Sequence, residues 1–364
     1  MLDKVFKGEI DFLQILDENG KVDESQFPAY LTEDLAVQMY KYMSFARTLD
    51  AKTLSLQRQG RAVTYAPLVG EEATQIGSAL AMRKDDIFVP NFRQHGVYLA
   101  RGLPLELYFI YWRGFEEGGA IPPEVKGLPV IVPVASQVPH AAGMAFAQKY
   151  KGTGNAVITY VGDGGTSEGD FYEALNFAGV FKVPLVTIIE NNQWAISVPR
   201  KKQTAAETLA QKAFAAGIKS IQVDGNDVFA VYKAVKDAIS FSTEGPTLIE
   251  CVTYRMSMHT TADDPTKYRP DAEVEAWKKK DPIERLGKYL LSKGLWDDSK
   301  EKAMQAEQVA AIDDAIKKAE AFKGDPASMF KNVYSFMPEM LQEELDEAEQ
   351  NNFWQENAEG AEKA

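Results

Sequence analysis

The chain is poor in cysteine and histidine: its 364 residues include one cysteine, Cys251, and three histidines. A single cysteine excludes an intrachain disulfide and a two-cysteine redox motif. No apolar run approaches the ~18 residues of a membrane-spanning helix. Asp3, Glu9 and Asp11 interrupt the first twenty residues, which argues against a secretory signal there. We therefore expect a soluble, cytoplasmic protein.

Basic residues are in the minority, because 40 Lys and Arg face 53 Asp and Glu, giving a net charge of −13. A general nucleic-acid-binding protein is normally basic, so this class is disfavoured. An anionic ligand would need a local cationic site. The hydrophobic fraction of 45% and the charged fraction of 26% are those of a globular chain that can bury a large core.

The middle of the chain alternates short apolar runs with helical patterns. The expected strands are the apolar runs 87–90, 156–161, 184–190, 220–223 and 246–254. The expected helices are 32–58, 70–83, 138–150, 167–181, 204–216 and 227–240. Continuous apolar strands separated by helices predict an α/β fold, a doubly wound and mostly parallel sheet with helices on both faces. Ligands of such sheets bind beyond the carboxyl ends of the strands.

Composition divides the chain into three expected parts. Residues 1–31 are weakly patterned and indicate an extended N-terminal arm with room for a short strand. Residues 32–274 hold the strand and helix patterns of the α/β domain. Residues 275–364 are amphipathic and charge-rich, which predicts a helical C-terminal extension that ends in an acidic tail.

A glycine-rich turn follows the expected strand 156–161. Its sequence, GDGGTSEGD at 162–170, predicts a helix that begins at Thr166 or Ser167, with Asp170 as the partner in a capping box. Free N–H groups at such a helix start can bind an anion. Asp163 would repel a phosphate there unless a cation lay between them.

The next expected strand, 184–190, runs into Asn191 and Asn192. Adjacent parallel strands would place Asp163 and Asn192 at the same edge of the sheet. Carboxylate, amide and carbonyl oxygens are the hard ligands of magnesium, and diphosphate oxygens with a water would complete an octahedron. Either piece alone is more typical of a simple turn. Their combination in this context favours a cation and diphosphate site.

This pair of motifs resembles the thiamin diphosphate motif, and its surroundings resemble the alpha subunit of the decarboxylating component of 2-oxo acid dehydrogenase complexes. The resemblance extends from about residue 32 to residue 340. It implies that the side chains of Asp163 and Asn192 and the carbonyl of Trp194 hold magnesium. It also implies that Gly164 and Gly165 donate backbone N–H groups to the diphosphate of thiamin diphosphate.

Two other segments agree with the resemblance. The segment 91–95 is similar to a Tyr-Arg segment that grips the diphosphate, which implies cofactor contacts for Phe92 and Arg93. Phe92 departs from the family tyrosine and loses a hydroxyl group. Val132 and Val134 fall in a segment that lines the aminopyrimidine ring in the family, where the match is looser.

A third segment, 254–269, follows the last expected strand and lacks helical periodicity, as a loop that orders over a site would. It is similar to the family's active-site loop. The resemblance implies that Arg255 contacts the diphosphate and that His259 faces the bound intermediate, where it positions groups or transfers protons. For His95, two roles remain equally open: it either supports the diphosphate ligands from behind or has a purely structural role. His140 reads as a residue at a helix start.

The chain has one diphosphate-binding domain and no second domain that could carry the glutamate needed to activate thiamin. In the family, a separate beta subunit supplies it, which implies an α2β2 heterotetramer that is inactive without the beta chain. The implied reaction is oxidative decarboxylation of pyruvate, with transfer of the acetyl group to a lipoyl arm of an acyltransferase partner.

The substrate is less firmly indicated than the cofactor. The segments 58–75 and 203–218 look more like the bacterial members that act on pyruvate, whereas the other motifs also occur in branched-chain relatives. Branched-chain 2-oxo acids and acetoin therefore remain alternatives. A nucleotide-dependent oxidoreductase is disfavoured, because Gly152-Thr153-Gly154 precedes a strand instead of opening a helix. A non-catalytic scaffold subunit is the remaining alternative.

Overall fold

The computed structural model describes residues 6–325 and 327–351. The chain forms two compact units, Met1–Ala319 and Glu320–Ala364. The domain boundaries that the sequence predicts at 31/32 and 274/275 both lie within the first unit, and they stay predictions. In the described part of the chain, no helix combines the length and the apolar character that crossing a membrane requires.

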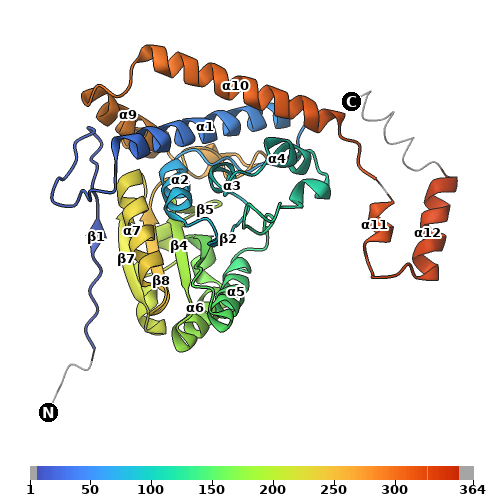
Figure 1. The fold of residues 1–364 in the computed structure, drawn as a ribbon, viewed down its shortest axis with the longest axis horizontal. Helices are drawn as coiled ribbons and strands as arrows, with labels where there is room; N and C mark the ends of the chain where they lie inside the picture. Colours follow the sequence, from blue (N-terminus) through green and yellow to red (C-terminus); the bar gives the residue numbers. More distant parts are fainter. Residues whose placement is uncertain (1–5, 326, 352–364) are drawn as a thin grey trace. The chain divides into compact units, whose positions relative to one another are not determined.

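A six-stranded parallel sheet forms the centre of the first unit, in the order β1-β7-β8-β4-β3-β2 (Figure 1). Its strands are β1 (Phe12–Leu13), β2 (Ile87–Val89), β3 (Val157–Gly162), β4 (Leu185–Asn191), β7 (Lys219–Asp224) and β8 (Thr247–Val252). Every residue of β4 is buried, as expected for a central strand covered on both faces. The predicted α/β fold is confirmed, and the N-terminal arm contributes the edge strand β1.

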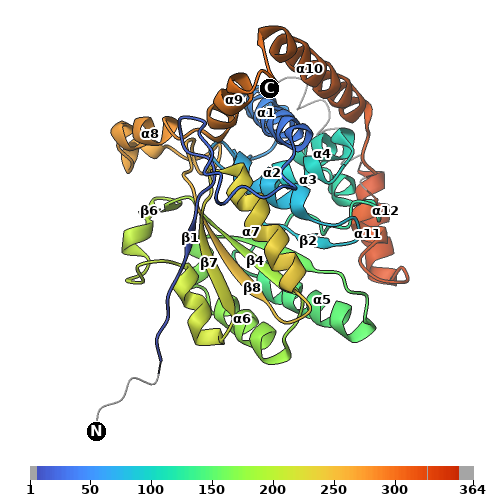
Figure 2. The same ribbon diagram turned by 60° about the vertical axis from the view of Figure 1, so that its left-hand side comes forward.

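Helices cover both faces of this sheet (Figure 2). Helices α5 (Gln137–Lys151) and α6 (Gly169–Phe181) pack together on one face, in a core that includes Val161 of β3. Helix α2 (Glu72–Ala81) packs against α7 (Val228–Phe241), and its Ser78 hydroxyl lies 3.0 Å from that of Tyr160. Because neighbouring residues of a strand face opposite ways, α2 covers the other face.

The remaining elements are largely helical. The α-helices longer than one turn are α1 (Glu33–Arg58), α3 (His95–Ala100), α4 (Leu105–Trp112), α8 (Asp271–Lys278), α9 (Pro282–Ser292), α10 (Asp298–Ala321) and, in the second unit, α12 (Glu339–Gln350). The others are the 3-10 helices η1 (Glu116–Gly119), η2 (Gly164–Ser167), η3 (Arg200–Lys202), η4 (Ala210–Ala216) and η5 (Pro265–Lys267), and the short α-helix α11 (Ser328–Lys331). A two-stranded hairpin, β5 (Trp194–Ala195) with β6 (Val198–Pro199), follows β4. The predicted acidic tail lies partly outside the described residues.

One predicted helix and one predicted helix cap were wrong. The segment 204–216 contains only the 3-10 helix η4, whose last turn ends at Gly217 with a left-handed φ of 64°. Helix α6 begins at Gly169, and its preceding residue makes no side-chain cap bond. Thr166 instead donates its hydroxyl hydrogen back to the Asp163 carbonyl at 2.7 Å, so it closes the η2 turn and no capping box forms.

Candidate active site at the carboxyl ends of β3 and β4

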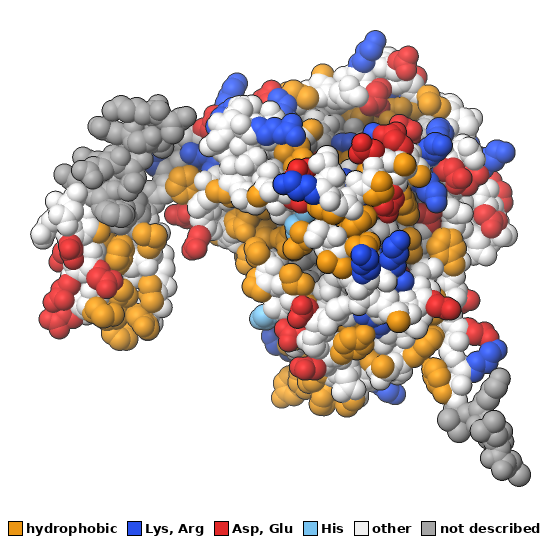
Figure 3. All heavy atoms as spheres, turned by 180° about the vertical axis from the view of Figure 1, so that it is seen from behind, with side chains coloured by type: hydrophobic (Ala, Val, Ile, Leu, Met, Phe, Trp, Pro, Cys, Tyr) orange, Lys and Arg blue, Asp and Glu red, His pale blue; other side chains and the backbone are white. Residues whose placement is uncertain are grey.

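A cavity of about 610 Å³ opens beyond the carboxyl ends of β3 and β4, where the topology of a parallel sheet predicts a ligand. Its volume lies within the ~300–1,000 Å³ that is typical of small-molecule sites. Its lining includes buried polar residues and exposed hydrophobic side chains, among the latter Val132 and Val134. Hydrophobic side chains are numerous on the face of the molecule that Figure 3 presents.

Asp163 follows β3 directly and lines the cavity with a buried carboxyl group. Gln203 donates its amide hydrogen to Oδ2 of Asp163 at 2.8 Å. Burial raises the pKa of Asp163 to about 6, against the opposing effect of this hydrogen bond. A nearby cation would relieve this penalty by favouring the charged carboxylate.

The glycines after Asp163 allow a close backbone approach. A Cβ atom on Gly164 would lie 2.6 Å from the Cβ atom of Ala195, and one on Gly165 would lie 2.6 Å from Cγ2 of Val161. Both positions line the cavity, so the turn presents main chain there and has no space for side chains. Such a turn can bring backbone N–H groups near an anion.

Asn192 lies at the same edge of the sheet, because β4 pairs with β3 in the register Gly162–Glu190. Its amide nitrogen donates to Oε1 of Glu71 at 2.7 Å, and its Oδ1 accepts from the backbone N–H of Trp194 at 3.3 Å. The Trp194 carbonyl accepts a hydrogen bond from Arg255 at 3.1 Å. The predicted oxygen donors of Asp163, Asn192 and Trp194 thus border one cavity.

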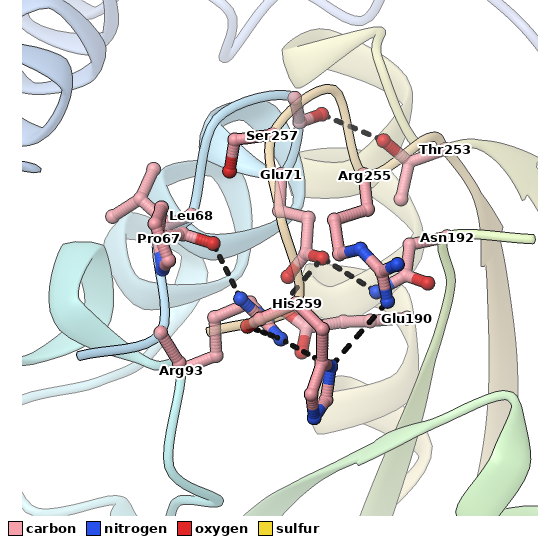
Figure 4. A network of polar contacts seen from close by, with 12 residues as sticks. Pro67, Leu68, Glu71, Arg93, Glu190, Asn192, Thr253, Arg255, Ser257 and His259 are labelled. Carbon is pink, nitrogen blue, oxygen red and sulfur yellow. Dashed lines mark hydrogen bonds and ion pairs between the residues drawn. The ribbon is translucent and has the colours of Figure 1, made fainter. Parts of the chain in front are cut away.

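Two guanidinium groups converge on His259 (Figure 4). Nδ1 of His259 accepts from Arg93 at 3.2 Å and from Arg255 at 3.4 Å. Burial, reinforced by these two positive charges, lowers the pKa of His259 to about 3. Because Nδ1 faces two donors, the single ring proton of the neutral imidazole belongs on Nε2.

A comparison with known proteins shows the family to which the chain belongs. The family model described as "Dehydrogenase E1 component" matches residues 40–328. The chain belongs to the dehydrogenase E1 component family. Dependence on thiamin diphosphate is general in this family. The resemblance inferred from the sequence is thereby confirmed, and the chain is a component of an enzyme.

Several named members of the E1 family are similar over nearly the whole chain. A protein of Staphylococcus aureus strain Mu50 is 45% identical over 344 residues, which cover 93% of each chain. One of Acholeplasma laidlawii is 45% identical over 336 residues, covering 91% of this chain and 97% of the relative. One of Staphylococcus epidermidis is 43% identical over 344 residues. Each is named pyruvate dehydrogenase E1 component subunit alpha.

The structure separates the remaining predicted site residues into two groups. Phe92, Arg93, Val132 and Val134 line the cavity, and the Phe92 ring meets the His259 ring edge to face at 5.8 Å. Arg255 is fully buried and lies behind the cavity wall, where it donates to the carbonyls of Trp194 and Ile196. Direct contact between Arg255 and a diphosphate would therefore require Arg255 to break its hydrogen bonds to these two carbonyls.

The other two histidines differ from His259. His95 is buried, its Nε2 lies 2.9 Å from the Ala66 carbonyl, and its ring stacks on Tyr65. Burial lowers its pKa to about 3. His95 is thus a neutral packing residue that does not line the cavity. His140 is exposed in the first turn of α5, at the helix start that the sequence predicted.

Among the polar residues that line the cavity, Glu71, Glu190 and Gln203 are not indicated as site residues by any sequence motif. Glu71 precedes α2, where an acidic residue reads as ordinary favourable charge at a helix start. Gln203 opens the segment 203–218, whose resemblance to the members that act on pyruvate assigns no role to this residue. Glu190 directly precedes the two asparagines, and the apolar run 184–190 predicts it as the last residue of a strand. A sequence signal for a place in the site was available only for Glu190, from its position at the end of a predicted strand.

The residues around the cavity fit a divalent cation bound together with a diphosphate. In residues 6–325 and 327–351, no three His, Cys, Asp or Glu side chains gather as a metal site of their own. The oxygen donors of Asp163, Asn192 and Trp194 would need further oxygens from a ligand, as magnesium does in phosphate sites. The glycine turn has no room for side chains, and Arg93 offers the cationic group that an anion requires.

Proposed function

We propose that this chain is the alpha subunit of a thiamin diphosphate- and magnesium-dependent pyruvate dehydrogenase. The observation that carries the proposal is the convergence of Asp163 and Asn192, from adjacent strands, on one cavity that also holds Arg93 and His259. Family membership supports the cofactor, and the names of the relatives support pyruvate as the substrate.

Asp163, Asn192 and the Trp194 carbonyl would hold the magnesium ion. The N–H groups of Gly164 and Gly165 and the guanidinium of Arg93 would hold the diphosphate, since both kinds of donor suit phosphate oxygens. When bound, thiamin diphosphate supplies the electron sink for decarboxylation of a 2-oxo acid. Arg255 would act mainly through its hydrogen bonds to the Trp194 carbonyl and to His259.

The other cavity residues would orient the reactants and exclude water. Phe92, Val132 and Val134 present apolar surface against which an aromatic ring can pack. His259 would offer its Nε2–H as a neutral hydrogen-bond donor, because its pKa of about 3 keeps the imidazole uncharged at neutral pH. A neutral donor can hold a carbonyl or a carboxylate oxygen without releasing its proton. The predicted role of His259 in proton transfer would need ligand binding to raise this pKa.

The chain would work as part of an α2β2 heterotetramer. Val132 and Val134 on the cavity rim are 59% and 57% exposed, and Ile196 beside them is 55% exposed. Exposed apolar residues around a functional cavity are typical of a surface that a partner covers. The beta subunit would also supply the carboxylate that activates thiamin. The acetyl group would pass to a lipoyl arm of the acyltransferase core, in the cytoplasm.

Pyruvate is preferred over branched-chain 2-oxo acids and acetoin because the three relatives described above are each named for pyruvate. Each extra methylene in an apolar pocket changes specificity by only ~1–3 kcal/mol, so the preference needs measurement. Co-expression with the beta subunit, followed by dye reduction in the presence of thiamin diphosphate and magnesium, provides it. We expect turnover with pyruvate well above that with 3-methyl-2-oxobutanoate. The reverse order would move the proposal to the branched-chain complex.

A further inference from the structure

Glu71 is a buried carboxylate on the wall of the cavity, directly before α2. Its side chain is 1% exposed and lines the cavity together with Asn192 and Arg93. Burying a carboxylate is costly unless charged or hydrogen-bonding groups compensate it. The contacts of Glu71 therefore indicate what this residue does.

The two oxygens of Glu71 have different surroundings (Figure 4). Oε1 accepts from Nδ2 of Asn192 at 2.7 Å and lies 3.8 Å from Nε of Arg93. Oε2 is buried and has no hydrogen-bond partner in the described structure. Glu71 thus links an expected magnesium ligand to an expected diphosphate ligand, from a helix start that is more than a hundred residues away from Asn192.

The bond between Glu71 and Asn192 decides which way the Asn192 amide points. Oε1 of Glu71 accepts its hydrogen bond from the NH2 group of Asn192, so the amide nitrogen and not the amide oxygen faces Glu71. The oxygen is then directed away from Glu71, where the Trp194 N–H at 3.3 Å is its one partner among the described residues. Without Glu71, the amide could rotate by half a turn and present its nitrogen to a cation.

We propose that Glu71 is a positioning residue that fixes the Asn192 amide with its oxygen available to magnesium and balances the charge of Arg93. This inference rests on the proposed function of the site. It adds Glu71, an outer residue of the cation site that no sequence motif indicated. Residues that orient metal ligands in this way typically contribute ~10–100-fold to metal affinity.

The test measures the binding of thiamin diphosphate to the assembled α2β2 protein by calorimetry, at a series of MgCl2 concentrations. For Glu71→Ala, we expect the magnesium concentration for half-maximal cofactor binding to rise by ~10–100-fold. Glu71→Gln should give a smaller rise, because its carbonyl can still accept from Asn192, although its amide can also rotate. A half-maximal concentration within twofold of the wild type in both variants would overturn the inference.

Glu72→Gln is the matched control. Glu72 is also fully buried, but it pairs with Arg47 at 2.7 Å and does not line the cavity. We expect Glu72→Gln to lower the thermal midpoint and to leave the magnesium dependence unchanged. Equal shifts in magnesium dependence for Glu72→Gln and Glu71→Gln would show a general packing effect and contradict the inference. If the proposed function is wrong, the wild type itself should bind thiamin diphosphate with an affinity that does not depend on the magnesium concentration.

Discussion

The Arg93 guanidinium donates a hydrogen bond to Nδ1 of His259 at 3.2 Å, and both residues line the cavity. Arg255 approaches the same nitrogen at 3.4 Å. Two permanent cations beside one ring nitrogen oppose protonation of the imidazole, and burial opposes it further. The arrangement makes His259 a neutral group with a defined tautomer.

We predict that His259 does not titrate between pH 5.5 and 8. Its pKa of about 3 lies well below this range, so the ring should stay neutral with its proton on Nε2. NMR of the alpha chain labelled at histidine tests this, because the chain has only three histidines and His259→Asn assigns the signal. A ring resonance that shifts with a midpoint near 6.5 would contradict the prediction.

Removal of the carboxylate in Asp163→Ala should abolish magnesium-dependent binding of thiamin diphosphate. We expect a loss of at least ~100-fold in cofactor affinity, since a direct ligand contributes no less than a residue that orients one. Assembly with the beta subunit should weaken without being lost. Chelation of magnesium by EDTA should reproduce the loss in the wild type. Unchanged turnover in the variant would refute the magnesium assignment and favour a scaffold role.

Gly164→Ala should damage the glycine turn by steric conflict. The new Cβ atom would lie 2.6 Å from the Cβ atom of Ala195, so the turn or the β5–β6 hairpin must shift. We expect a destabilisation of ~1–3 kcal/mol in chemical unfolding, with weaker cofactor binding. Gly143→Ala is the control, because a Cβ atom there meets nothing within 4 Å and alanine favours the helix. Equal stability changes in the two variants would exclude the steric explanation.

Asp50 gives a pH prediction outside the cavity. Burial raises its pKa from 3.8 to about 7, although Tyr65 and the Leu68 N–H donate hydrogen bonds to it at 2.7 and 2.8 Å. The unfolded chain loses this proton near pH 4, whereas the folded chain keeps it up to about pH 7. The stability contributed by Asp50 is therefore complete below pH 4 and is lost as the pH rises to 7.

Asp50→Asn removes this titration and keeps an oxygen that can accept both hydrogen bonds. The thermal midpoint of the wild type, relative to that of Asp50→Asn, should fall steadily between pH 4 and pH 7. The corresponding difference in the free energy of unfolding should change by no more than about 1.4 kcal/mol per pH unit. A difference that is independent of pH in this range would mean that Asp50 is charged in the folded chain.

The order of strands and helices could be read from the sequence because each depends on a local pattern. Five apolar runs became the strands β2, β3, β4, β7 and β8, and the helices beside them began and ended within a few residues of their predicted bounds. Errors fell where local signals conflict. The segment 204–216 has small residues that suit a helix, but its turns close as a 3-10 helix and end at Gly217.

The sequence by itself determined which chemical groups meet at the sheet edge. Asp163 and Asn192 follow adjacent parallel strands, and the geometry of such strands brings their ends together without any further information. Tertiary packing alone decided the state of those groups. It set the neutral imidazole of His259, the place of Arg255 behind the Trp194 carbonyl and the bond from Asn192 to Glu71. These features depend on burial and on contacts between segments far apart in the chain, which no local pattern of residues encodes.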